Sequence, residues 1–268
     1  MRINVKHIGK KLGMDNQEIL RIAIKQSALD CNAKEEDFVS SENVLTDLKF
    51  SEKIRKYYSE PISCILVSYG NGTVASVKED CRDIMEEYLS RFTTYKCFET
   101  PAIHWLDERL EPLGQKTCYM AEYWLPDIER VEILPCRYET KLLTAADFQE
   151  LYLPEWSNAL CEKRKELDVL GVGAYDNGVL IGLAACSADC DTMWQIGIDV
   201  LPAYRRQGIA SALTSRLTAE ILKRDKVPFY CCAWSNIASA RNAIRSGFQP
   251  AWTEISVKTL EYVKECNA

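Results

Sequence analysis

The chain has 268 residues, enough for a sizeable core in one or two domains. Apolar residues make up 47% and charged residues 27%, as in ordinary globular proteins, and the net charge of -6 argues against a general affinity for nucleic acid. No apolar run approaches the roughly 20 residues that cross a bilayer, and the amino terminus lacks the apolar region of a secretory signal. We therefore expect a cytoplasmic protein without nucleic-acid or membrane partners.

Twelve cysteines are a high number for such a chain. No two are spaced as C-x-x-C, and only His7 and His104 could join them as imidazole ligands, so we expect no metal site. Several cysteines stand inside apolar runs such as FYCCAW, where a reduced thiol acts as a small hydrophobic side chain. Without a secretory signal, free structural thiols are favoured over disulfides.

The first half, residues 1–130, is predicted to be a mixed α/β domain of unknown role. Its stretch GKKLGMDNQEILRIA loosely resembles a helix-turn-helix, but a surface helix capped by Asp15 or Asn16 suits the acidic chain better. The apolar patterns then predict, in order, a strand over 62–69, a tight turn at Asn71–Gly72, a returning strand over 73–77, a helix over 79–92, a helix from about Pro101 and a strand over 118–125. No motif in this half can be attached to chemistry.

A boundary is expected near Pro126–Pro135, and residues 136–268 form the second predicted domain. Thr144 could cap a helical region that extends to Trp156, and Asp176-Asn177-Gly178 is a strong hairpin signal. The predicted elements are a strand over 139–144, the helical region, a hairpin over 170–188, a strand over 194–201, a helix over 208–224, a strand over 229–234, a short helix from Asn236 to Gly247 and a last strand through 253–258.

The junction WQIGIDVLPAYRRQGIAS carries the clearest chemical signal. A strand stops at Pro202, two arginines follow, and Gly208 opens a helix. A helix start leaves about four amide N–H groups without partners and carries about half a positive charge. Because glycine has no Cβ, an anion can approach this backbone closely. The junction therefore predicts a site for a phosphate or pyrophosphate, although it is neither a Walker loop nor a dinucleotide fingerprint.

The sequence Arg205-Arg206-Gln207-Gly208-Ile209-Ala210 resembles the R/Q-x-x-G-x-G/A signature of the GNAT superfamily of acyl-CoA N-acyltransferases. Asn236-Ile-Ala-Ser239 followed by Ser246-Gly247-Phe248 is similar to that family's second signature. The resemblance covers about residues 139–258. It implies a mixed central sheet of GNAT type with flanking helices, preceded here by the second mixed α/β domain. The two-part layout also resembles, more faintly, a subgroup of the zwittermicin-resistance type.

The resemblance implies how acetyl-CoA would be held as a co-substrate. Backbone amides near the signature would cradle its pyrophosphate beside the arginines, Ile198 and Val200 would pair through the backbone with the pantetheine arm, and Asn236 and Ser239 would hold the far end of that arm. The implied binding residues are Ile198, Val200, Arg205, Arg206, Gln207, Gly208, Ile209, Ala210, Ser211, Asn236 and Ser239.

Catalysis by direct attack of an amine on a thioester needs a base for the amine and an acid for the departing thiolate. Many family members place a tyrosine acid seven residues after the asparagine, but here that position is Ala243. Tyr230 and Ser239 are substitutes by location. For the base, Asp199 and Glu155 are candidates, although strand alternation could turn Asp199 away and either carboxylate could serve as a solvated or capping group.

We therefore expect an N-acetyltransferase that moves the acetyl group of acetyl-CoA to a primary amine of a small molecule in a ternary complex. The amino-terminal half would shape the acceptor side or form a contact in a homodimer. The alternative is a non-catalytic acyl-CoA-binding sensor or regulatory module, which the missing tyrosine and the loose helix-turn-helix would suit.

Overall fold

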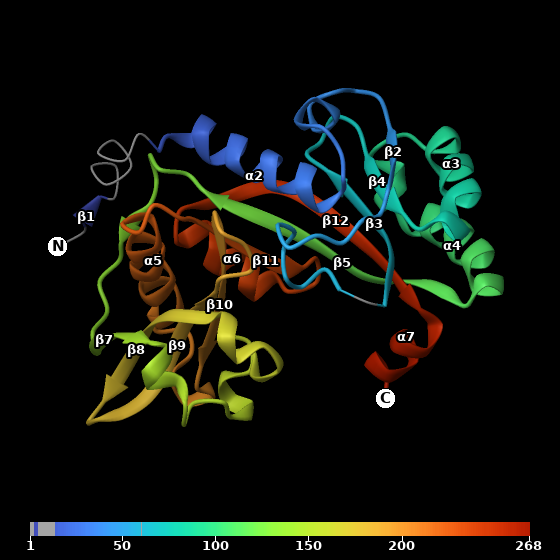
Figure 1. The fold of residues 1–268 in the computed structure, drawn as a ribbon. Coiled ribbons are helices and arrows are strands. Elements are labelled where there is room, and N and C mark those ends of the chain that lie inside the picture. The colour runs from blue at the N-terminus through green and yellow to red at the C-terminus, as the bar shows by residue number, and fades with distance from the viewer. Residues whose placement is uncertain (1–2, 5–13, 60) are drawn as a thin grey trace. The chain divides into compact units, whose positions relative to one another are not determined.

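The computed structural model describes residues 3–4, 14–59 and 61–268 (Figure 1). It confirms the mixed α/β class. The strands are β1 (Ile3–Asn4), β2 (Val44–Asp47), β3 (Ile62–Ser68), β4 (Val74–Val77), β5 (Gln115–Pro126), β6 (Glu132–Ile133), β7 (Glu139–Thr144), β8 (Asp168–Asp176), β9 (Val179–Ser187), β10 (Met193–Val200), β11 (Val227–Ala233) and β12 (Phe248–Thr259). The α-helices are α2 (Asn16–Asp30), α3 (Arg82–Arg91), α4 (Thr100–Leu110), α5 (Ile209–Leu222), α6 (Ile237–Arg245) and α7 (Leu260–Cys266).

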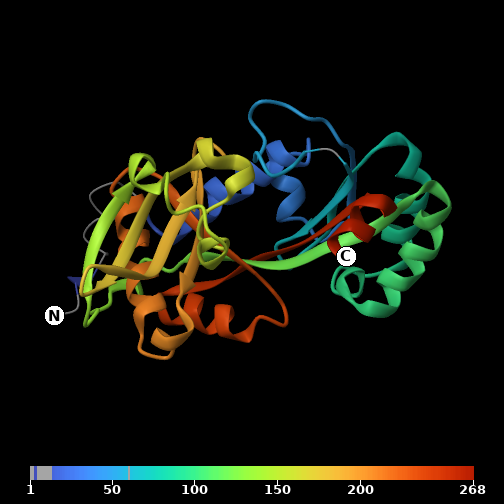
Figure 2. The same ribbon diagram turned by 90° about the horizontal axis from the view of Figure 1, so that it is seen from below.

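One mixed sheet of ten strands runs through the chain, in the order β2-β4-β3-β12-β5-β11-β10-β9-β8-β7. The chain forms two compact units, the first from Met1–Ile22 and Trp124–Pro250 and the second from Ala23–Tyr123 and Ala251–Ala268. The neighbouring strands β5 (green) and β12 (red) each belong partly to both units (Figures 1 and 2). The described residues therefore show no separate domain before the GNAT-type sheet, because these long strands continue through both units.

The first unit is built around helix α5. Its apolar side chains, among them Ile209, Leu213 and Leu217, pack with buried residues of β8, β9 and β10 in one core. The hairpin of β8 and β9 forms as predicted, because Asn177 and Gly178 both take the positive φ that a two-residue turn requires, at 48° and 83°. Gly247, with φ 90°, ends α6 in the left-handed conformation, also as predicted.

Two local predictions are wrong. Residues 144–156 form only 3-10 turns, Ala145–Phe148 and Pro154–Trp156, because proline disfavours helical backbone at the preceding residue and Leu153 is accordingly extended. Thr144 nevertheless stands at the N-cap position of the first turn, where its amide and its hydroxyl donate to the Asp147 carboxylate. The Asn71–Gly72 signal gives no two-residue turn. A side chain at Gly72 would overlap backbone oxygens of Ser40 and Glu42. Glycine is therefore needed here because the backbone of residues 40–42 passes close to it.

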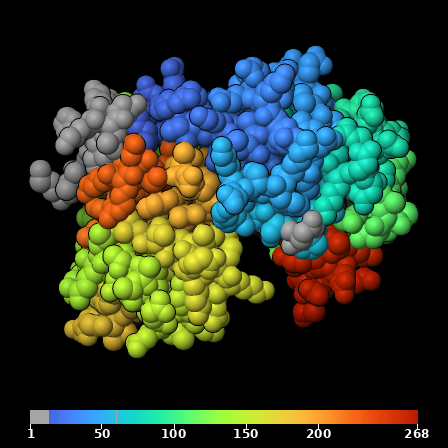
Figure 3. All heavy atoms as spheres, in the orientation of Figure 1, coloured from blue at the N-terminus to red at the C-terminus, as the bar shows by residue number. Residues whose placement is uncertain are grey.

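Within the second unit, helices α3 and α4 pack on β3, β4 and β12 around an aromatic and aliphatic core that includes Tyr88, Leu106 and Val257. Helix α7 follows β12 and is largely exposed, and it appears as the red group in Figure 3. The predicted helix start at Asp15 or Asn16 is settled, since the Asp15 carboxylate accepts from the amide of Glu18 at 2.8 Å. Residues 9–13 of the helix-turn-helix pattern, like His7, lie outside the described residues.

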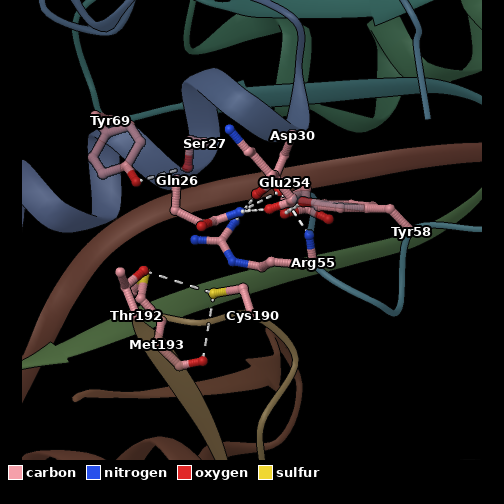
Figure 4. Close-up of polar contacts among 11 residues, drawn as sticks. Gln26, Ser27, Asp30, Arg55, Tyr58, Tyr69, Cys190, Thr192, Met193 and Glu254 are labelled. Carbon is pink, nitrogen blue, oxygen red and sulfur yellow. Dashed lines mark hydrogen bonds and ion pairs between the residues drawn. The ribbon is translucent and has the colours of Figure 1, made fainter. Parts of the chain in front are cut away.

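The second unit also buries a network of charged side chains (Figure 4). Asp30 of α2 is paired with the Arg55 guanidinium at 2.5 Å, and both side chains are almost fully buried. The Tyr58 hydroxyl donates to the Glu254 carboxylate of β12 at 2.6 Å. Burial raises the pKa of Glu254 to about 7, although Tyr58 and Arg55 oppose this shift. The network thus places two carboxyl groups close to one guanidinium inside the protein.

Candidate active site

The turn after β10 has the shape of an anion cradle. The chain passes through the 3-10 turn Pro202–Tyr204, Arg206 takes a left-handed φ of 62°, and Gly208 takes a left-handed φ of 80° as the N-cap of α5. The left-handed region strains most residues but not glycine, which explains the residue at position 208. No side chain caps this helix start.

The amides of this turn are available for a ligand. Among the described residues, no hydrogen-bond acceptor is found for the N–H groups of 206–211, and the first bonded amide of the helix is that of Ala212, to the carbonyl of Gly208 at 3.1 Å. A Cβ placed on Gly208 would meet nothing within 4 Å. Open space, free donors and the positive end of α5 therefore coincide, and a diphosphate fits these properties.

The side chains around the turn are only partly directed at the cradle. The Arg205 Nε donates to the carbonyl of Val200 at 2.9 Å, so this arginine ties the end of β10. Arg206 is exposed. The side-chain oxygen of Gln207 accepts from the Tyr138 hydroxyl at 3.0 Å. The sequence pattern therefore did not reveal the structural partner of Arg205. It also missed Tyr138 as a neighbour of the turn.

Beside the turn, two parallel strands separate. The register of β10 with β11 ends at Ile196 and Tyr230, whereas β10 continues to pair with β9 as far as Val200. The Leu201 amide bonds to the Ile181 carbonyl on the β9 side, so by alternation the backbone groups of Ile198 and Val200 face the opening toward β11. This is the gap in which a pantetheine arm was expected. One of the carbonyl oxygens that border the gap, that of Val200, already accepts from the Arg205 side chain.

At the start of the opening, a buried phenol meets a half-exposed hydroxyl. Tyr230, the last β11 residue in register with β10, is 2% exposed, and its hydroxyl lies 2.7 Å from the Ser239 hydroxyl. Burial raises the pKa of Tyr230, while the neighbouring side chains of Ser239 and Asn242 lower it. Asn236 caps α6 by accepting from the Ser239 amide at 3.1 Å. Two sequence candidates, Tyr230 and Ser239, are therefore in direct contact.

The two candidate bases differ in their surroundings. Asp199 accepts three hydrogen bonds from Asn158 and Ala159, at 2.7 to 2.9 Å, and so holds a neighbouring loop. Glu155 is exposed, and no described residue donates a hydrogen bond to its carboxylate. Ala243, where many relatives carry the tyrosine, is fully buried in the core of the first unit.

Comparison with protein families agrees with this geometry. A family model described as GNAT acetyltransferase matches residues 106–252, which is more than half of the chain. The chain belongs to the GNAT acetyltransferase family. It is accordingly an acetyl-CoA-dependent acyltransferase. A search of curated proteins found no match.

Solved structures give weaker likenesses. A GCN5-related N-acetyltransferase-like protein from Streptococcus suis is 20% identical over 58% of this chain and 67% of its own, with a TM-score of 0.44. A Drosophila protein is 14% identical over 95% of this chain and 94% of its own, with a TM-score of 0.45. A Salmonella typhimurium protein assigned as an acetyltransferase and solved with its cofactor acetyl-CoA is 18% identical over 47% and 95%, with a TM-score of 0.34. The family assignment rests on the family model, and nothing in these comparisons supports a zwittermicin-resistance subgroup.

Three further features of this GNAT protein concern its cysteines, its possible metal ligands and its helices. All twelve cysteines are free thiols, as expected. In the part of the chain that the structure describes, no three His, Cys, Asp or Glu side chains gather as metal ligands. No helix among the described residues is long and apolar enough to cross a membrane.

Proposed function

We propose that this GNAT protein transfers the acetyl group of acetyl-CoA to a primary amine of a small molecule, by direct attack within a ternary complex. The observation that carries the proposal is the row of free amides at residues 206–211 next to the opening between β10 and β11. An anionic end and an extended arm of one ligand would fit these two features together.

In the proposed complex, the amides of residues 206–211 bind the pyrophosphate, and the exposed Arg206 adds a positive charge. The backbone of Ile198 and Val200 binds the pantetheine arm, and Asn236 and Ser239 border it at the start of α6. Acetyl-CoA supplies a thioester, whose carbonyl carbon accepts the amine. Arg205 contributes by fixing the end of β10 rather than by direct contact with the ligand.

Tyr230 is the acid that we propose. A new C–N bond forms, the C–S bond breaks, and the departing thiolate takes up a proton. A phenol whose pKa is raised by burial keeps its proton at neutral pH, and Ser239 connects this phenol to the half-exposed side of α6. In this proposal the pair, from β11 and the start of α6, replaces the tyrosine absent at Ala243 later in the same helix.

Glu155 is the carboxylate that we propose to take the proton of the attacking amine, directly or through water. It is exposed, whereas Asp199 is occupied by three donors. The net charge of -6 suits a cationic acceptor, such as an aminoglycoside, a polyamine or a basic amino acid.

The direct test incubates the protein with acetyl-CoA and either kanamycin, spermidine or L-lysine, and quantifies CoA and the acetylated amine by mass spectrometry. Thiol reagents are unsuitable here, because the protein itself carries twelve free cysteines. We expect equal amounts of the two products with at least one amine. Tight binding of CoA without any acetylated product would instead support the non-catalytic sensor.

A further inference from the structure

The side of β10 that faces an incoming amine follows from the packing of its side chains. Ile198 and Val200 point toward α5, because both pack on the core that this helix covers. Successive residues of a strand point to opposite faces, so Gly197 and Asp199 point to the other face. If the arm of acetyl-CoA lies along this stretch, α5 closes one face, and the acceptor approaches from the side of the sheet on which Gly197 and Asp199 lie.

A single loop segment, Trp156–Leu160, covers that face. A side chain at position 197 would overlap the backbone carbonyl of Asn158 and lie 3.0 Å from the Cα of Ala159. A glycine inside a strand is a known sign of such a close backbone approach. The segment therefore rests directly on the part of β10 that β11 leaves.

The ends of the segment are anchored in a small core of their own. Trp156, Ala159 and Leu160 are each about 95% buried and pack with Phe148 and with residues of β9. Ser157 and Asn158, between these anchors, remain exposed. The anchors hold the segment to the sheet, and the Trp156 carbonyl accepts from the Ala159 amide at 3.1 Å, but among the described residues no anchor fixes this backbone to β10 where the two cross.

Asp199 supplies that fixation. Its Oδ2 accepts from the amides of Asn158 and Ala159 at 2.8 and 2.9 Å, and its Oδ1 accepts from the Asn158 side-chain amide at 2.7 Å. Charge-assisted bonds to an ionised carboxylate are about twice as strong as neutral ones. We propose that Asp199 is a positioning residue for the amine acceptor, holding Trp156–Leu160 as a wall that borders the acceptor's path to the thioester. This inference rests on the proposed function.

The test compares Asp199→Asn with Asp191→Asn, which changes an exposed carboxylate just before the same strand. An asparagine at 199 removes the carboxylate charge and has one acceptor oxygen, so its NH2 group must face either the two backbone amides or the NH2 group of Asn158. We expect the KM for the best amine of the kanamycin, spermidine and L-lysine panel to rise at least tenfold, with the Kd for CoA changed less than twofold. Asp191→Asn should leave both constants unchanged.

Two further readouts separate positioning from catalysis. In Asp199→Asn, hydrogen exchange of the Asn158 amide should accelerate at least tenfold, while that of amides 170–174 in β8 stays as in the wild type; the Ala159 amide is a weaker probe because it also donates to the Trp156 carbonyl. In this variant, kcat/KM should still fall toward acidic pH, as it would when a carboxylate other than Asp199 is the base. An unchanged amine KM, unchanged exchange or loss of that fall would each overturn the inference. A wild-type protein inactive with all three amines would contradict the proposed function itself, whereas an active wild type with an unaffected variant would contradict only the role of Asp199.

Discussion

Gly208 joins two properties in one residue, a left-handed backbone and an open space in front of it. Gly178 in the β8–β9 turn shares both, with φ 83° and nothing within 4 Å of a Cβ. The two glycines therefore carry the same backbone penalty for substitution, roughly 1 to 2 kcal/mol, but only Gly208 borders the free amides. This pair offers a matched comparison of ligand binding with folding.

Gly208→Glu should abolish measurable binding of CoA, because its carboxylate would enter the space proposed for the pyrophosphate and repel it. Gly178→Glu should lower the melting temperature similarly and leave the CoA affinity within twofold of the wild type. Isothermal calorimetry and thermal unfolding of both variants check this. Equal affinities in the two variants would place the pyrophosphate elsewhere.

Tyr230→Phe removes only the hydroxyl that contacts Ser239. If this phenol protonates the departing thiolate, kcat should fall about 100-fold, the lower end of the range for a lost general acid. The Kd for CoA should stay within a factor of two, since the phenol is not among the pyrophosphate donors. Steady-state kinetics and calorimetry test this, and a kcat close to that of the wild type would assign protonation to solvent.

At the scale of elements, the stretch Arg55–Tyr58 links helix α2, through the Asp30–Arg55 pair, to strand β12, through the bond of Tyr58 to Glu254. The Glu254 carboxyl keeps its proton up to about pH 7 in the folded protein, whereas its ordinary pKa is 4.5. Between these values the folded state binds more protons than the unfolded state. The free energy of unfolding from this group is therefore largest below pH 4.5 and falls as the pH rises to 7, by about 3 kcal/mol.

Glu254→Gln should remove this part of the pH dependence. From pH 4.5 to 7 the wild type should lose unfolding free energy that the variant keeps, so the variant gains stability relative to the wild type. Above pH 7 the difference between the two should stay constant. Asp168, whose pKa burial raises to about 6, acts in the same direction and remains in both proteins. Denaturant unfolding across that range is the measurement, and parallel curves would show that the network holds Glu254 ionised.

Local signals explain which elements the sequence could predict. Asn177–Gly178 and Gly208 specify their turns through their own backbone preferences, so the hairpin and the start of α5 were found. The stretch 144–156 has a helical pattern, but Pro154 and the contact on Gly197 favour 3-10 turns. The two residues that donate to Asp199, Asn158 and Ala159, are about 40 residues away, and no local pattern reports them. The isolated Gly197 was the one available sign of that contact.

At the scale of the whole molecule, the strand order departs from the chain order. Strand β5 was predicted as a strand, but its neighbours were not, because it enters the sheet between β11 and β12, which follow it by about 100 residues. The family match likewise begins at residue 106, inside α4. The predicted domain 136–268 therefore lacks a strand from the interior of its sheet.

A fragment of residues 136–268 should be insoluble when expressed alone, because both β11 and β12 would present open edges. Co-expression with a fragment of residues 1–135 should restore a soluble pair that co-purifies and binds CoA. Solubility and gel filtration compare the two cases. A soluble, CoA-binding 136–268 fragment would show that β5 is dispensable for the fold.

The separation of β10 from β11 leaves main-chain groups of the sheet without a partner strand when no ligand is present. If acyl-CoA fills this gap as proposed, it binds only the folded state, and the cellular supply of acyl-CoA then helps to determine how much enzyme survives. At a hundredfold excess over Kd the gain is about 2.7 kcal/mol. Cells short of acyl-CoA should therefore degrade this protein faster than cells that are well supplied with it.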